Sequence, residues 1–225
     1  MLDSLLQIVA PHHCYGCDNV GTLLCDNCKY DITQEPFSGC IACLKPSKTG
    51  VCSECHTPYR DAWSVGERSE VLESLIDGFK FERVKEVYKT LAELLDSVIP
   101  ELGTDVVVVP IPTVASHMRV RGYDHARLVA KQLAKRRGWQ LSPLLGRKTT
   151  TKQRGTSGKV RLAQAREAFS CRATLDSTKH YLLVDDVFTT GATMYYGAKV
   201  LRAQGAKNVS IAVIARQPFD DHRKI

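Results

Sequence analysis

The residues best suited to chemistry lie near position 185, where two adjacent carboxylates follow an apolar run. The run from Tyr181 to Val184 predicts a buried parallel strand, and ligands of open α/β sheets bind at the carboxyl ends of such strands. Asp185 and Asp186 fall at that end. Their oxygens can accept hydrogen bonds from the hydroxyls of a ribose and help to place a magnesium ion.

The loop that follows the acidic pair is built for an anion. It offers backbone N–H groups and hydroxyls from Thr189, Thr190, Gly191, Ala192 and Thr193. It opens a helix expected over 192–204, with Gly205 as the stop, and the positive end of that helix favours a phosphate monoester. Strand, acids and loop together predict a site for a phosphorylated ribose. The alternative is an acidic pair that caps a helix in an ordinary α/β turn.

An apolar strand, an acidic pair and a T-T-G-x-T loop resemble the signature of the type I phosphoribosyltransferases. The resemblance implies binding of 5-phosphoribosyl 1-pyrophosphate (PRPP) with Mg²⁺. The chemistry would then be displacement of pyrophosphate from C1 through an oxocarbenium-like transition state, which depends on positioning and charge neutralisation.

Cysteine usage predicts metal binding in the N-terminal part of the chain. Eight of the nine cysteines form four CxxC pairs, and two such knuckles complete one closed tetrahedral zinc site. Eight ligands therefore imply two structural zinc ions. The pairs are Cys14/Cys17, Cys25/Cys28, Cys40/Cys43 and Cys52/Cys55.

Two ligand arrangements are open. Sequential use of the pairs gives a double zinc ribbon, and a cross-braced arrangement joins the first knuckle to the third. We favour the sequential one, because Gly21 and Gly50 lie where short hairpins need turns. The neighbouring His12, His13 and His56 are alternative ligands.

Regular elements begin after the cysteine-rich segment, so we expect a zinc-binding module over 1–60 and an α/β domain over 61–225. Apolar spacing predicts helices from Ser69 to Phe79 and from Val84 to Val98. Further elements are expected at 106–109 (strand), 124–137 (helix ended by Gly138) and 208–215 (strand). Alternating strands and helices predict a parallel, doubly wound sheet.

No targeting segment is recognised. The first residues carry an acid at position 3 and only a short apolar pattern, which fits neither a signal peptide nor a membrane span. We therefore expect a cytoplasmic protein.

Positive charge is concentrated in one part of the chain. Between Val114 and Arg172, fifteen Lys or Arg residues stand against two acids, while the whole chain has a formal charge of +7. Such a segment predicts an anionic partner, although the cluster at Lys131, Lys135, Arg136 and Arg137 also fits a solvated helix face. Two other clusters, Arg119 to Tyr123 and Arg147 to Arg161, are expected in loops after strands, where a pyrophosphate would bind.

The order of these motifs resembles the ComF family of competence-associated phosphoribosyltransferase-like proteins over nearly the whole chain. Lys80 matches the lysine of the family's L-K-[YF] motif, with Phe79 in the preceding apolar position. Thr150 and Gln153 match the family's T-x-x-Q motif. The chain departs from the family at 124–126, where Asp-His-Ala replaces Asn-Gln-Ala, and at 156–161, where TSGKVR replaces L-S-R-x-E-R.

On this reading, four residues are expected to be catalytic: Asp185, Asp186, Arg119 and Arg121. The residues expected to contact PRPP are Asp185, Asp186, Val187, Thr189, Thr190, Gly191, Ala192, Thr193, Thr113 and Lys148. The backbone around 113–116 would help to hold the pyrophosphate, and the loop 148–161 would close over it.

The acceptor is not readable from the sequence, so enzymatic activity stays an open question. The first hypothesis is a PRPP-binding protein of DNA uptake, and the ComF resemblance implies single-stranded DNA and a helicase-like partner. The second is a non-catalytic DNA-binding adaptor that keeps the PRPP site as a sensor, and a nucleobase phosphoribosyltransferase of salvage is a further alternative. Candidate platforms for base stacking are Tyr15, Tyr30, Phe37 and Tyr59, which also fit the core of a small module.

Overall fold

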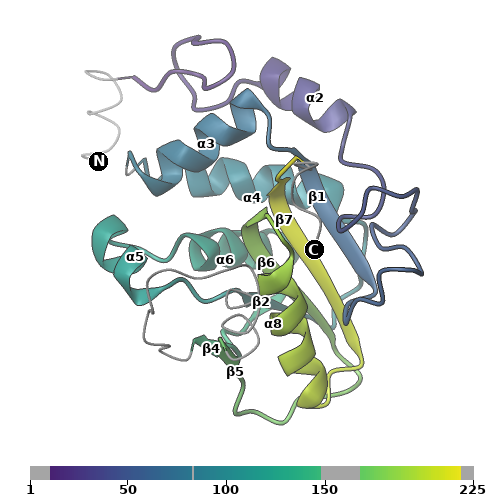
Figure 1. Ribbon diagram of the computed structural model, residues 1–225. Coiled ribbons are helices and arrows are strands. Elements are labelled where there is room, and N and C mark those ends of the chain that lie inside the picture. The colour runs from purple at the N-terminus through teal and green to yellow at the C-terminus, as the bar shows by residue number, and fades with distance from the viewer. Residues whose placement is uncertain (1–10, 83, 148–167, 219–225) are drawn as a thin grey trace, which may run out of the picture.

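A five-stranded parallel sheet forms the centre of the molecule (Figure 1). The computed structural model describes residues 11–82, 84–147 and 168–218. The strands are β1 (Asp61–Glu67), β2 (Val106–Pro110), β3 (Gln140–Leu141), β6 (His180–Phe188) and β7 (Asn208–Arg216), in the order β1-β7-β6-β2-β3. Every neighbouring pair is parallel, which confirms the predicted fold class.

Helices cover both faces of the sheet. α3 (Glu70–Lys80), α4 (Val87–Val98) and α6 (His125–Arg137) lie on one face, and α8 (Ala192–Ala203) lies on the other (Figure 1). Because side chains alternate along a strand, β6 contributes Leu182 and Val184 to the first core and Tyr181 and Leu183 to the second. β2 and β6 therefore read as continuous apolar runs, as expected of strands that are buried on both faces.

Two local features differ from the expected elements. β6 continues through both acids to Phe188, because β7 pairs with it as far as Arg216. The segment after β2 is not a loop but the short helix α5 (Ala115–Arg121), which ends where Gly122 adopts a left-handed conformation (φ 83°). A separate two-stranded antiparallel sheet joins β4 (Gly146–Arg147) to β5 (Phe169–Ser170).

The cysteine-rich segment packs against the α/β domain on both sides of β1. Its helix α2 (Asp26–Gln34) contacts α4 and β1. Cys14 and Leu24 belong to the core under α3 and α4, whereas Ile41 and Tyr59 belong to the core under α8. The fold of this segment is therefore coupled to both halves of the main core. None of the helices in the described part of the chain has the length and apolar character needed to cross a bilayer.

Gly50 is required by its turn, which predicts a strong effect of substitution. Its φ of 74° is unfavourable for other residues, and an added Cβ would come within 1.8 Å of the backbone oxygen of Ala62. We expect Gly50→Ala to reduce the free energy of unfolding by about 2–3 kcal/mol. Gly103 has a similar φ of 79° with open space around it, so Gly103→Ala is the control for the conformational term alone. Equal losses in denaturant titrations of both variants would contradict the steric argument.

Candidate functional site

The acidic pair lies at the carboxyl end of β6 and is held by groups from two helices. The Oδ2 atom of Asp186 lies 2.7 Å from Nζ of Lys80 at the end of α3, and 2.8 Å from Nε2 of His125 at the start of α6. All three side chains are largely buried. Asp185 Oδ1 accepts a hydrogen bond from the Asp186 backbone N–H at 2.9 Å.

The two carboxyls differ in their electrostatic environment. Burial opposes ionisation of Asp186, but the contacts with His125 and Lys80 outweigh it, so the pKa of Asp186 is well below its usual range. Burial and the neighbouring negative charge of Asp186 raise the pKa of Asp185. Asp186 is thus a stable anion near neutral pH, and Asp185 holds a proton more readily. A cation or a hydroxyl donor would favour ionisation of both.

A hydrogen-bond chain joins the acidic pair to α5. Arg121 can only donate, and its Nη1 atom lies 3.0 Å from Nδ1 of His125. The hydroxyl of Thr113 also lies near Nδ1 of His125, at 3.4 Å, but it donates its hydrogen to Asp124 at 2.8 Å. Nδ1 of His125 therefore accepts from Arg121, which leaves Nε2–H to face Asp186. The arrangement fixes the histidine ring between an expected pyrophosphate-binding arginine and an expected ribose-binding acid.

The expected phosphate loop lies between β6 and α8, beside the acids. Thr189 and Thr190 are exposed, and the Thr190 hydroxyl accepts from the Ala192 backbone N–H at 3.4 Å. Gly191 has a φ of 74°, and a Cβ there would lie 2.4 Å from the ring of Phe188. The glycine is therefore needed both for the turn and for the close packing of the loop on the strand.

The structure brings together some of the expected site residues and separates others. Arg121 reaches the acidic pair through His125, whereas Arg119 is exposed on α5. Thr113 belongs to the same network, because its hydroxyl oxygen lies 3.4 Å from Nδ1 of His125. Lys148 and the loop 148–161, with Thr150 and Gln153, lie outside the described residues. The roles assigned to all of these residues stay predictions.

His125 is the main site residue that sequence reasoning did not assign. It forms a compact group with Asp185 and Asp186, whose ligand-type atoms all lie within 4.8 Å of one another. The available signal was the replacement of Asn-Gln-Ala, which the ComF resemblance leads one to expect at 124–126, by Asp-His-Ala. In the fold, Asp124 caps α6 by accepting from the Arg127 backbone N–H at 3.1 Å, so its neighbour His125 begins the helix and faces β6.

The eight paired cysteines form two clusters with the sequential grouping. One cluster contains Cys14, Cys17, Cys25 and Cys28, and the other contains Cys40, Cys43, Cys52 and Cys55. In four of the cysteine pairs within these clusters the sulfur atoms lie 3.4 to 3.7 Å apart. A tetrahedron with metal–sulfur bonds of about 2.3 Å has edges of about 3.8 Å, so the donor set fits zinc.

Backbone N–H groups favour the thiolate form of one cysteine in each cluster. Although burial opposes ionisation, backbone N–H groups lower the pKa of Cys14 to about 6 and that of Cys40 to about 7. The backbone N–H of Cys25, for example, donates to Cys14 Sγ at 3.3 Å. These amides would hold the ligand sulfurs in place around a metal.

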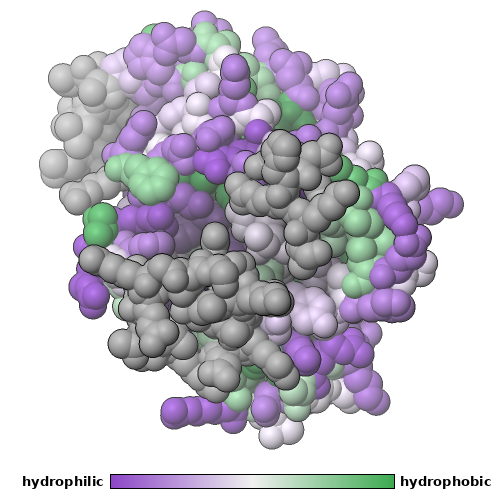
Figure 2. Space-filling view, viewed as in Figure 1, coloured by the Kyte–Doolittle hydropathy of each residue, from purple (hydrophilic) through white to green (hydrophobic). Residues whose placement is uncertain are grey.

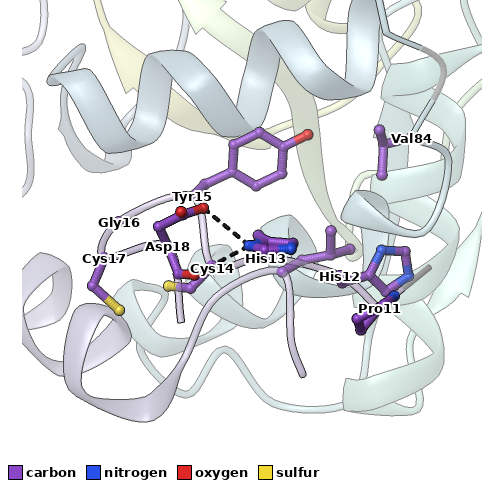
Figure 3. A pocket seen from close by; sticks show the side chains of 10 residues that line it. Pro11, His12, His13, Cys14, Tyr15, Gly16, Cys17, Asp18 and Val84 are labelled. Carbon is purple, nitrogen blue, oxygen red and sulfur yellow. Dashed lines mark hydrogen bonds and ion pairs between the residues drawn. The ribbon is translucent and has the colours of Figure 1, made fainter. Parts of the chain in front are cut away.

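The histidines next to the first cluster do not join it. Figure 3 shows the pocket beside this cluster, which is lined mainly by residues 11–18. His13 lies in this pocket with Nδ1 3.2 Å from the carboxylate of Asp18, which links it to the turn of the knuckle rather than to the sulfurs. The grouping of four thiolates in each cluster leaves no place in these two sets for His12, His13 or His56.

Comparison with known proteins agrees with this geometry. The family model described as phosphoribosyl transferase domain matches residues 81–224. The chain is 29% identical to competence protein F of Haemophilus influenzae, with 91% of this chain and 95% of that protein covered. It is 27% identical to DNA utilization protein YhgH of Salmonella typhimurium (86% and 90% covered) and 25% identical to competence protein ComFC of Bacillus subtilis (86% and 84% covered). Because the domain match spans more than half of its length, this chain belongs to the phosphoribosyl transferase domain family, with ComF proteins as relatives along most of its sequence.

Proposed function

We propose that the protein binds PRPP with Mg²⁺ at the acidic pair and acts in the cytoplasm in the handling of incoming DNA. The observation that carries the proposal is the placement of Asp185 and Asp186 near the carboxyl end of a central strand, which leads into a glycine-dependent loop and the start of α8. Ribose hydroxyls would bind the carboxylates, and the 5′-phosphate would bind the loop at the positive end of the helix.

The charges around the acidic pair support the same assignment. Lys80 and Arg121 come from different elements and approach the acids from the α3 and α5 sides, respectively. Arg121 is available for the negative charge that develops on a departing pyrophosphate, whereas Lys80 is paired with Asp186 and keeps that acid ionised. Magnesium would be held by the carboxylates together with the ligand oxygens, and it would neutralise the pyrophosphate further. The role in DNA handling rests on the names of the relatives.

The phosphate loop gives a direct test of PRPP binding. We expect PRPP with Mg²⁺ to raise the melting temperature of the wild-type protein, because a ligand that binds only the native state stabilises it. Thr190→Glu places a negative charge in the loop and should remove this shift, whereas Thr190→Ser should keep it. Since Thr190 is exposed, the melting temperature without ligand should change little. A full shift in the glutamate variant would place the sugar phosphate elsewhere.

Catalysis and a purely DNA-binding role are separated by a second experiment. Release of pyrophosphate from PRPP in the presence of candidate bases supports a transferase. Salt-sensitive oligonucleotide binding that survives Asp185→Ala and Asp186→Ala supports an adaptor. The structure weakens one argument for the adaptor, because Arg136 and Arg137 of the basic α6 face both pair with Asp96 of α4 and serve the packing of two helices.

A further inference from the structure

We propose that Phe81, with the Arg121 guanidinium over its ring, is the platform on which the acceptor base stacks. The proposal rests on the proposed function, since it places a planar heteroaromatic base beside the ribose that the acidic pair would hold. Phe81 follows α3 directly and is 67% exposed. A planar ligand stacked on the ring would remove part of this apolar surface from water, which is favourable.

The ring lies close to the expected ribose site through a short series of contacts. The Cζ atom of Arg121 is 5.3 Å from the centroid of Phe81, and the same guanidinium contacts His125, which contacts Asp186. The preceding residue, Lys80, contacts Asp186 directly. A base stacked at Phe81 would therefore stand beside a ribose held by the acidic pair.

The backbone holds the platform in place. The Phe81 N–H donates to the Asp77 backbone oxygen at 2.7 Å and so ends α3, and the Val84 N–H returns to the Gly78 oxygen at 3.1 Å. The neighbouring Phe79 points the other way, is buried, and stacks on Tyr123 with ring centroids 5.3 Å apart. One aromatic thus anchors the end of the helix while the next one is presented to solvent from a fixed position.

The surroundings favour a base over an apolar partner. Figure 2 shows a hydrophilic hollow between the end of α3 and α5, with only small hydrophobic spots at its border. Lys80 and Glu82 flank Phe81 in the sequence, and the guanidinium of Arg121 lies over its ring. A nucleobase suits this setting, because its face can stack on Phe or on a guanidinium plane while its polar edge stays hydrogen-bonded.

The other aromatic residues considered as stacking platforms are less suitable than Phe81. Tyr59 is buried, Tyr15 packs across Gly78 of α3, and Phe37 lies against the guanidinium of Arg216. Tyr30 is exposed to a similar degree as Phe81 (60%), but it lies on α2 of the cysteine-rich segment. It therefore provides a matched control for general stacking on an exposed ring.

The experiment measures binding of the four free nucleobases and of a dT oligonucleotide to the full-length protein with saturating PRPP and Mg²⁺. Stacking contributes about 1–3 kcal/mol per base, so Phe81→Ala should weaken binding of the preferred ligand by about 5- to 150-fold, while Phe81→Tyr and Tyr30→Ala should bind nearly as wild type does. The free-base arm and the oligonucleotide arm show from which source the base comes.

Three results would overturn the assignment: unchanged binding in Phe81→Ala, equal losses in Phe81→Ala and Tyr30→Ala, or no binding of any base or oligonucleotide to the wild type. The PRPP-induced rise in melting temperature is measured on the same samples and should be unaffected by Phe81→Ala. If the wild type shows the PRPP-induced rise but binds no base, only the stacking platform is rejected. If the wild type shows no PRPP-induced rise, the PRPP site itself is rejected.

Discussion

Replacing Cys40 with serine is expected to remove one of two zinc ions and to lower the melting temperature by about 10–20 °C. The binding free energy of a structural zinc site is comparable to the whole net stability of a typical domain, and a loss of about 5 kcal/mol already gives a shift of this size. Cys40 is fully buried next to Ile41, whose backbone oxygen accepts from Nε of Arg216 at 2.9 Å. Loss of the second cluster would therefore also disturb the end of β7.

Cys14→Ser should have a comparable effect through the other face of the sheet, because Cys14 and Leu24 belong to the core under α3 and α4. Cys171 stands outside both clusters, so Cys171→Ser controls for the loss of a thiol. Elemental analysis should give close to two zinc per wild-type chain and per Cys171→Ser chain, and close to one in each cluster variant. One zinc per wild-type chain would mean that one of the two clusters is not a site.

Replacing Lys80 with methionine is expected to destabilise the protein by about 3–5 kcal/mol and to abolish the PRPP-dependent rise in melting temperature. The ammonium lies 2.7 Å from a largely buried carboxylate, and removal of one partner leaves that charge insufficiently compensated. His125 keeps its contact with Asp186, which favours the lower end of the range. A suitable control is Lys29→Met, because the Lys29–Glu93 pair at 2.9 Å is more exposed and should contribute less than about 1 kcal/mol.

The acid sensitivity of the protein provides a second measure of the same pair. Since the pKa of Asp186 is lowered in the native state, the unfolded chain binds more protons at acidic pH. The stabilising contribution is complete above the unfolded pKa of about 3.9 and decreases as the pH falls below it. In urea titrations between neutral and acidic pH, the free energy of unfolding of Lys80→Met should therefore fall less steeply with decreasing pH than that of the wild type. If Lys80→Met has the same free energy of unfolding and the same pH dependence as the wild type, the contact between Lys80 and Asp186 has no energetic role.

Comparison of sequence and structure shows which properties are local. The apolar runs at 106–109 and 181–184 identified central strands because a strand buried on both faces needs apolar side chains at successive positions. Gly138 and Gly205 marked helix ends because their positive φ values are accessible mainly to glycine. The cysteine spacing also limited the possible ligand sets, and the favoured sequential grouping is confirmed by the two clusters.

Contacts between distant segments were decided only by the tertiary structure. Lys80, His125 and Asp186 are far apart in the chain, and they meet because α3 and α6 pack on the same face of the sheet near the carboxyl end of β6. No local periodicity specifies which side chain at a helix end turns towards a particular strand. The sequence by itself therefore determined the strand, the acids and the loop, whereas the packing of helices across the sheet decided which cations neutralise those acids and which aromatic ring remains exposed beside them.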